Sequence, residues 1–211
     1  MNALSFFSQH GDEILRATLE HVWLVVATMA LAIAIGVPLG ILVARRPWLS
    51  KPILGSANIA ETIPSLALLG FLLPAPWLGE RADRVAITAL TLYALLPIIR
   101  NTTAGITGVD PAVREAARGM GMTPRQILFQ VELPLSLSTV LAGIRVATVL
   151  TIGVATIAAA VGAGGLGEFI FRGLAMVNNR LILAGAIPAA ALALLADFIL
   201  SVLERRLRPA R

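Results

Sequence analysis

The sequence predicts an all-α, polytopic membrane protein whose 211 residues form a single transmembrane domain (residues 1–211). Apolar side chains make up 57% of the chain and the mean hydropathy is +0.85, well above the values of soluble globular domains. Only 14% of the residues are charged, and these gather between long apolar runs instead of spreading along the chain. The chain has no cysteine, which excludes disulfides, thiol nucleophiles and thiolate metal sites.

Five apolar runs are expected to cross the roughly 30 Å of bilayer hydrocarbon as helices. They cover about residues 22–44, 59–78, 85–99, 135–161 and 181–203. Prolines such as Pro64 break the second run, and Pro97 interrupts the end of the third, which Arg100 and Asn101 close. Ahead of the first run, residues 11–21 alternate charged and apolar side chains, which suits an amphipathic helix at the membrane interface.

The polar segment 110–134 stands out between the third and fourth runs. Asp110 is a favoured N-cap residue and Pro111 suits the first helical position, so a short helix is expected to begin here. Its apolar residues fall on one stripe at helical spacing, namely Val113, Ala116, Ala117 and Met120. The charged residues of this helix are expected to face away from that stripe; they are Arg114, Glu115 and Arg118.

A glycine elbow is predicted to separate this helix from a second one. Gly121, with Gly119 before it, can adopt a positive φ and end the first helix. Thr123 then suits an N-cap, with Gln126 placed three residues later to complete a capping box. Pro134 is expected to interrupt the second helix. The segment should therefore form two small capped helices joined at an angle.

The spacing of this segment resembles the EAA loop of ABC-importer permeases. Residues 115–117 read Glu-Ala-Ala; Gly121 follows after three residues, and Val131-x-Leu133-Pro134 after nine more. The family usually has isoleucine where Val131 stands. The resemblance implies that the segment couples the membrane helices to a separate ATP-hydrolysing subunit. The residues that would carry this role are Glu115, Ala116, Ala117, Gly121, Val131, Leu133 and Pro134.

Four further segments resemble the permeases of osmoprotectant importers: residues 62–69, 143–147, 152–156 and 162–167. With them the resemblance covers about residues 19–206. It implies the type I ABC-importer permease fold and the import of quaternary amines such as glycine betaine, carnitine or choline. It also implies two copies of an ATP-binding subunit, a second permease (identical or paralogous) and an extracytoplasmic substrate-binding protein. ATP and Mg²⁺ would bind the partner ATPase, and this chain would hold no cofactor.

Other functions remain open at this stage. Segment 110–134 could be an ordinary surface hairpin or a DNA-binding helix-turn-helix, although its attachment to membrane runs at both ends disfavours DNA. The chain could also be a permease for another solute, such as an amino acid, or a passive channel or scaffold subunit. Enzyme activity is not expected. The only lysine, Lys51, lies outside any P-loop pattern, and His10 and His21 are too few for a metal or catalytic site.

The distribution of basic residues predicts the orientation in the bacterial inner membrane. With five spans, the loops after the first and third runs and the C-terminus share one side. That side carries Arg45, Arg46, Lys51, Arg100, Arg114, Arg118, Arg125, Arg205, Arg206, Arg208 and Arg211. The other side carries only Arg16, Arg81, Arg84, Arg172 and Arg180. The positive-inside rule then places segment 110–134 and the C-terminus in the cytoplasm and the N-terminus outside.

Four residues of the predicted spans are candidates for the translocation path or for a charged network: Glu61, Tyr93, Arg145 and Asp197. Glu61 stands where the resembled family often has glutamine. Arg145 lies about ten residues into the fourth run. Either it faces a cavity or pairs with Glu61 or Asp197, or the span starts late and Arg145 sits at the interface.

Aromatic residues are 5% of the chain, too few for an obvious cation cage. Those expected within the spans are Trp23, Phe71, Trp77, Tyr93 and Phe198. We therefore expect selective capture of a quaternary amine to occur mostly outside this chain.

Overall fold

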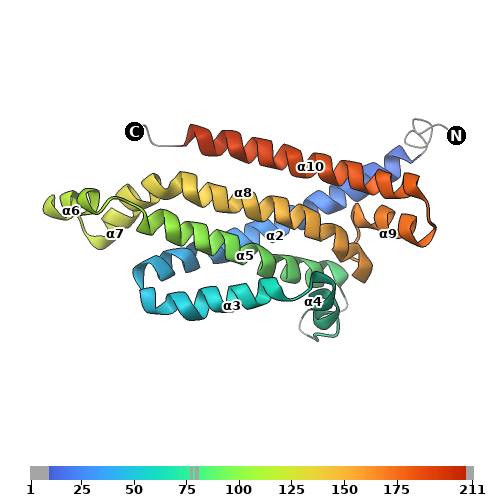
Figure 1. The fold of residues 1–211 in the computed structure, drawn as a ribbon, viewed down its shortest axis with the longest axis horizontal. Coiled ribbons are helices and arrows are strands. Elements are labelled where there is room, and N and C mark those ends of the chain that lie inside the picture. Colours follow the sequence, from blue (N-terminus) through green and yellow to red (C-terminus); the bar gives the residue numbers. More distant parts are fainter. Residues whose placement is uncertain (1–9, 77, 79–80, 208–211) are drawn as a thin grey trace.

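The computed structural model describes residues 10–76, 78 and 81–207, and Figure 1 shows an elongated bundle of helices. No strand occurs in this described part of the chain, which confirms the all-α prediction. The helices are α2 (Gly11–Arg45), η1 (Pro47–Leu49), α3 (Ser50–Thr62), α4 (Ser65–Leu72), α5 (Ala82–Thr107), α6 (Pro111–Gly119), α7 (Pro124–Gln126), η2 (Ile127–Glu132), α8 (Leu133–Ala158), η3 (Ala159–Val161), α9 (Gly167–Ala175) and α10 (Asn179–Arg206).

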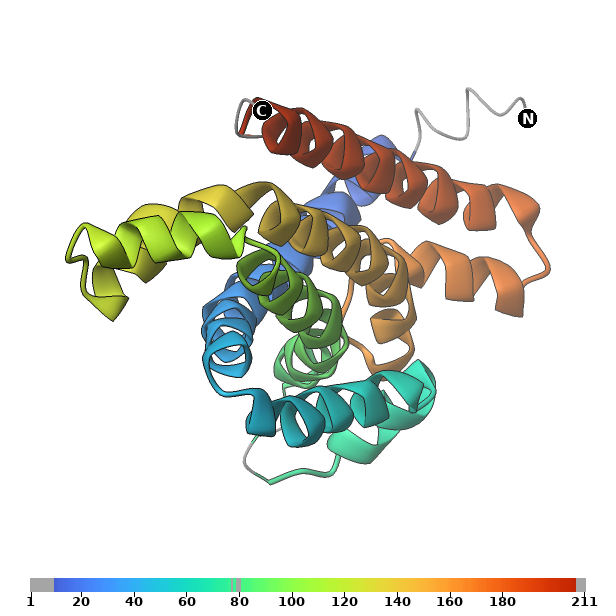
Figure 2. The same cartoon turned by 60° about the vertical axis from the view of Figure 1, so that its left-hand side comes forward.

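Helix α5 lies at the centre of the bundle, packed against α2, α3 and α8, while α10 lies along the outer side of α8 (Figures 1 and 2). The central core pairs larger residues such as Met29 and Ile98 with small, fully buried ones such as Ala32, Ala147 and Ala155. Small residues allow membrane helices to approach closely, so van der Waals contact can hold them without a hydrophobic driving force. Helices α6 and α7 lie at one end of the bundle, hereafter the loop end, and α9 lies at the opposite end.

Among the described residues, the helices long and apolar enough to cross a membrane are α2, α5, α10 and the combined helix Pro124–Val161. A fifth span arises if the bent pair formed by Pro47–Thr62 and α4 is counted as one crossing. The first span begins earlier than expected. Residues 11–21 do not form a separate interfacial helix but continue directly into α2, which runs for 35 residues.

The second span departs most from the sequence prediction of one run over residues 59–78. Helix α3 already begins at Ser50, and it ends at Thr62, where the chain bends by 99° into α4. Pro64 explains the break, because a proline disfavours helical geometry in the residue before it, and Ile63 is extended with φ −70° and ψ 129°. The predicted end of this run includes residue 77, which lies outside the described residues.

The third run does not end at Pro97, as we expected from the sequence. Helix α5 continues through Pro97 to Thr107, so Arg100 and Asn101 are helical and do not close it. Asn101 donates its side-chain N–H to the Pro97 carbonyl at 2.8 Å, while Thr103 donates to the Gly40 carbonyl of α2 at 3.2 Å. Pro97 leaves the carbonyl four residues earlier, that of Tyr93, without its helical N–H, and membrane helices tolerate this where other helices surround them, as α2, α3 and α8 pack against α5.

The expectation that Pro134 interrupts the second small helix is also wrong. The helix that begins at Pro124 continues to Val161, so the small helix is the first part of the fourth span. The turns before Pro134 are a π-helix over Ile127–Glu132, in which Leu133 donates its backbone N–H to the Leu128 carbonyl, five residues back. The wider π-turn relieves the clash between a proline ring and the preceding turn, so the helix passes the proline without breaking.

The glycine run over residues 162–167 forms a tight turn back into the bundle. Gly162, Gly164 and Gly165 all have φ near +80°, a conformation that side chains other than glycine rarely adopt. The Gly165 N–H donates to the Glu20 carboxylate at 3.1 Å, which fixes the turn against α2. The turn leads into α9 and then into α10, which spans residues 179–206 where we predicted 181–203.

Candidate functional site

The candidate site is the loop between α5 and α8, residues 110–134, hereafter called the coupling loop after the role that its sequence resemblance implies. Its first helix, α6, is capped as the sequence predicted, with the Asp110 carboxylate accepting from the Ala112 N–H at 2.8 Å. At its other end Gly121 has φ +79°, its N–H donates to the Arg118 carbonyl, and the Met122 N–H donates to the Ala117 carbonyl. These two bonds are the Schellman motif, which requires a left-handed residue at Gly121.

The second helix begins with the predicted capping box. The Thr123 N–H donates to the Gln126 side-chain oxygen at 2.8 Å, and the Gln126 N–H donates to the Thr123 hydroxyl at 3.4 Å. Caps at both helix starts and a glycine turn between them fix the angle of α6 relative to the helix that follows. The glycine elbow predicted from the sequence is therefore confirmed.

The apolar stripe of α6 faces outward, contrary to the usual orientation of such a stripe toward the core. Val113 is 40% exposed and Met120 is 74% exposed, and Ala116 is also exposed, whereas Ala117 is buried. Arg114, which we expected on the outer face, instead turns toward the bundle. An exposed apolar stripe beside charged residues is typical of a surface that another protein covers.

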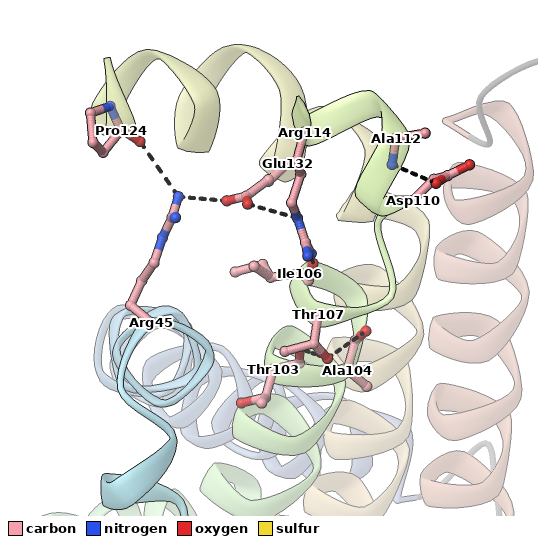
Figure 3. A network of polar contacts seen from close by, with 10 residues as sticks. All are labelled: Arg45, Thr103, Ala104, Ile106, Thr107, Asp110, Ala112, Arg114, Pro124 and Glu132. Atoms are coloured by element: carbon pink, nitrogen blue, oxygen red, sulfur yellow. Dashed lines mark hydrogen bonds and ion pairs between the residues drawn. The ribbon is translucent and has the colours of Figure 1, made fainter. Parts of the chain in front are cut away.

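A buried carboxylate explains the inward turn of Arg114. Glu132, with only 4% of its side chain exposed, lies between two arginines (Figure 3). Its Oε2 is 2.5 Å from Nη2 of Arg45 at the end of α2, and its Oε1 is 3.0 Å from Nε of Arg114 on α6. Arg45 also donates to the Pro124 carbonyl at 3.5 Å, and Arg114 donates to the Ile106 carbonyl of α5.

This network connects α2, α5, α6 and the start of the fourth span through one carboxylate (Figure 3). It borders a cavity of about 220 Å³ whose walls include the same three charged side chains and Arg118. A buried carboxylate is costly unless it is paired and hydrogen-bonded, and two arginines satisfy this requirement at Glu132. A displacement of α6 would therefore be transmitted directly to the ends of three membrane helices.

Sequence reasoning missed Glu132 and did not assign Arg45 a partner. Glu132 stands between Val131 and Leu133 of the loop pattern, and its charge at the start of an apolar span was the available signal. Its partner Arg45 lies 87 residues away in the chain, so spacing could not join them. Among the predicted coupling residues, Val131 and Leu133 are half-buried; Glu115, Ala116, Gly121 and Pro134 are exposed.

The predicted charged pair of the fourth span is confirmed in part. Arg145 lies 3.7 Å from Asp197 and 3.6 Å from Glu204, both on α10. Glu61, the other partner we considered, does not pair with Arg145; it lies on α3, which packs against α5 instead. Glu204 lies in the last turns of α10, so one of the two carboxylates that neutralise Arg145 comes from the loop end of the bundle.

The aromatic residues do not gather. Trp23, Phe71 and Phe198 lie on α2, α4 and α10 and are 62%, 85% and 66% exposed, while Tyr93 is half-buried on α5. Trp77 lies outside the described residues. Tyr93 donates its hydroxyl to the Ile63 carbonyl at the break between α3 and α4.

An all-α membrane bundle with a doubly capped, outward-facing loop between two of its spans defines the permease class of transport proteins. The chain belongs to the family of binding-protein-dependent transport system inner membrane components, whose model matches residues 36–209. This assignment agrees with the loop pattern read from the sequence. The chain is therefore a membrane-spanning transport subunit and not an enzyme, and its family implies an ATP-binding subunit and a substrate-binding protein as partners.

Curated relatives align over nearly the whole chain. A carnitine transport permease protein of Listeria monocytogenes is 45% identical over 98% of this chain and 93% of its own length. An osmoprotectant import permease protein of Salmonella typhimurium is 42% identical over 99% and 98%, and a choline transport system permease protein of Bacillus subtilis is 41% identical over 98% and 94%.

Solved structures agree on the fold. The structure of the MetNI methionine ABC transporter in inward-facing conformations contains a chain that is 25% identical, with a TM-score of 0.83 over 93% of this chain and 96% of that one. An amino acid ABC transporter shares the fold at 22% identity, with a TM-score of 0.73. The type I importer permease fold expected from the coupling loop is thereby confirmed.

Proposed function

We propose that this permease forms the translocation path for a quaternary-amine osmoprotectant such as glycine betaine, carnitine or choline. The observation that carries the proposal is 41–45% identity, over at least 97% of this chain, to permeases named for carnitine, osmoprotectants and choline. The relatives named for amino acids are solved structures at 25% identity or less. Sequence similarity therefore favours the quaternary amines over an amino acid.

The coupling loop is the proposed contact with the ATPase, which would bind ATP and Mg²⁺. Its exposed apolar residues, Val113, Ala116 and Met120, form a stripe that a groove on that partner could cover. Capped helix ends and the Glu132 network hold this stripe in a fixed position relative to the membrane helices. A rigid contact of this kind can convert movement of the ATPase into movement of the spans.

The proposed assembly contains two permeases and two ATP-binding subunits. One bundle of five spans presents one coupling loop, so a second permease would supply a second loop for the second ATP-binding subunit and complete the path. Helix α10 supports this arrangement, since most of its length is exposed and apolar and must contact lipid or another chain. The second permease is either an identical chain or a paralogue.

The orientation follows from charge and from the position of the coupling loop. Helices α6 and α7 lie at the same end as the last turns of α10, so they share a membrane side with its basic end (Figure 1). Residues 1–9 and 208–211 lie outside the described residues. A reporter fused after Arg211 should read cytoplasmic, and one placed before Met1 should read external. Readouts from a single side would exclude the five-span topology.

Uptake tests the proposed substrate class. The permease, produced with its ATPase and binding protein in cells that lack other osmoprotectant importers, should support ATP-dependent uptake of radiolabelled choline, carnitine or glycine betaine. A coupling-loop variant that assembles but fails to couple, described in the Discussion, is the matched negative control. Uptake of methionine or another amino acid without any quaternary amine would instead favour the amino-acid alternative.

A further inference from the structure

The exposed face of α3 is polar although the helix lies along the membrane bundle. Lys51, Asn58, Glu61 and Thr62 are all exposed on it, beside one exposed large apolar residue, Ile59. On the opposite face Ala57 is buried in a cluster with Val43, Leu96 and Ile99. A helix surface with this composition is costly against lipid, so it should face water or another chain.

The position of Tyr93 places the end of α3 at mid-depth of the bundle. Tyr93 donates its hydroxyl to the Ile63 carbonyl, directly after α3 ends. Within the 26 residues of α5, Tyr93 lies about 17 Å from one end and about 21 Å from the other at 1.5 Å per residue. Glu61, two residues before Ile63, therefore lies near the middle of the membrane thickness.

Two features add negative charge at this end of α3, one turn beyond the Arg100 guanidinium. The carboxylate of Glu61 pairs with no side chain among residues 10–76, 78 and 81–207, in contrast to Asn58 one turn earlier, which accepts from Arg100 at 3.2 Å. The α3 helix also ends here, and the carbonyl end of a helix carries partial negative charge. An exposed, unpaired carboxylate at this depth is costly unless it faces an aqueous path or a cation.

We propose that Glu61, at the broken end of α3, forms a cation subsite in the translocation path that favours substrates with a net positive charge. The inference rests on the proposed function, because it refines which quaternary amines this permease moves best. A quaternary ammonium has no N–H to donate, so charge attraction and aromatic faces are what recognise it. Glu61 supplies that attraction, and Tyr93 acts as a positioning residue that fixes the helix break beside it.

The subsite acts on choline and glycine betaine differently. Choline carries a net charge of +1, whereas glycine betaine also carries a carboxylate, which Glu61 repels. Glutamine matches glutamate in size but carries no charge, so replacing Glu61 with it should alter substrate preference while leaving a working permease. Capture from outside would remain the task of the binding protein, and Glu61 would act on substrate already in the path.

Transport by the complete importer provides the first test. At saturating substrate, Glu61→Gln should lower choline uptake about tenfold relative to wild type and glycine betaine uptake by less than about threefold. Glu61→Asp should keep the wild-type ratio of the two. An unchanged ratio in Glu61→Gln, or equal loss of both substrates, would overturn the subsite. A wild-type importer that moves no quaternary amine would instead overturn the proposed function.

Thiol labelling provides a second test that does not need transport. Because the chain has no cysteine, Glu61→Cys introduces a single thiol, and mass spectrometry of this permease within the importer can follow its reaction. The probe is 2-(trimethylammonium)ethyl methanethiosulfonate, which carries a quaternary ammonium and reacts with thiolates in contact with water. The matched control is Leu194→Cys, at mid-length of α10, where the native side chain is 72% exposed.

The Glu61→Cys thiol should react at least about tenfold faster than the Leu194→Cys thiol, since only the first faces an aqueous path. In Thr62→Cys, which places the thiol beside an intact Glu61, excess choline should slow the reaction by about threefold or more, because the two cations compete for one place, and adding Glu61→Gln should remove this protection. Equal rates at the two positions would show that Glu61 does not face water. A fast Thr62→Cys reaction that choline leaves unchanged would show an aqueous position without a cation subsite, and this too would overturn the proposal.

Discussion

Gly121→Leu should reduce transport to less than about a tenth of wild type while the permease remains in the membrane at normal abundance. Gly121 has φ +79°, and a leucine pays about 1–2 kcal/mol to adopt this left-handed conformation. No atom lies within 4 Å of the position its Cβ would take, so the effect comes from backbone strain and not from a clash. Loss of the Schellman turn would change the angle of α6 and displace its exposed stripe.

Two variants in the same turn control this experiment. Gly121→Asn should keep most transport, since asparagine tolerates the left-handed region better than leucine. Gly119→Ala should also remain near wild type, because Gly119 has an ordinary φ and open space around its Cβ position. Uptake and membrane abundance are measured together. Wild-type uptake by Gly121→Leu at equal abundance would remove the coupling role, and loss in strict proportion to protein amount would indicate a cap glycine alone.

The parts of the coupling loop that the sequence predicted correctly depend on local interactions. The Asp110 cap, the left-handed Gly121 and the box formed by Thr123 and Gln126 each satisfy backbone groups within a few residues. Propensity and spacing describe such interactions well, because both partners are adjacent in the chain.

The wrong predictions concern positions where tertiary contacts override a local rule. Pro97 and Pro134 were expected to end helices, yet α5 continues through Pro97 where α2, α3 and α8 pack against it, and a π-helix before Pro134 lets the fourth span continue. Helix α3 was placed nine residues too late because its polar face hides it from a search for apolar runs. The polar residues of α3 can be assigned to a membrane helix only when the fold shows which of its surfaces they occupy.

The ion-pair network could not be predicted, because its three charged residues come from distant parts of the chain. Arg45, Arg114 and Glu132 each appear in the sequence as isolated charges near the ends of apolar runs. The predicted orientation of Arg114 was also wrong, because helical spacing assigned the core side of α6 to its apolar stripe. The buried carboxylate reverses that preference, because pairing Arg114 with Glu132 leaves the apolar stripe exposed.

Glu132→Gln should destabilise the importer by about 3 kcal/mol. It should also lower the number of substrate molecules moved per ATP hydrolysed. The expected loss lies at the lower end of the range for a broken buried ion pair, since the side chains of Arg45 and Arg114 remain 35% and 23% exposed. Without the carboxylate the two guanidinium groups lose their common partner and repel each other. The ends of α2 and α5 are then no longer held to α6, so ATPase movements reach the membrane helices less completely.

Thermal unfolding of the purified importer and the number of substrate molecules moved per ATP hydrolysed measure the two effects. Asp83→Asn is the matched control, because it breaks the exposed pair of Arg81 and Asp83 at the opposite end of the bundle and should cost less than about 1 kcal/mol. Adding Arg114→Gln to Glu132→Gln should cost less than the sum of the two single changes, since both remove one interaction. Additive stability losses would show that Arg114 and Glu132 do not act as one unit. An unchanged number of substrate molecules moved per ATP would show that the network only stabilises the fold, because a connection that transmits movement must lower that number when its central carboxylate is removed.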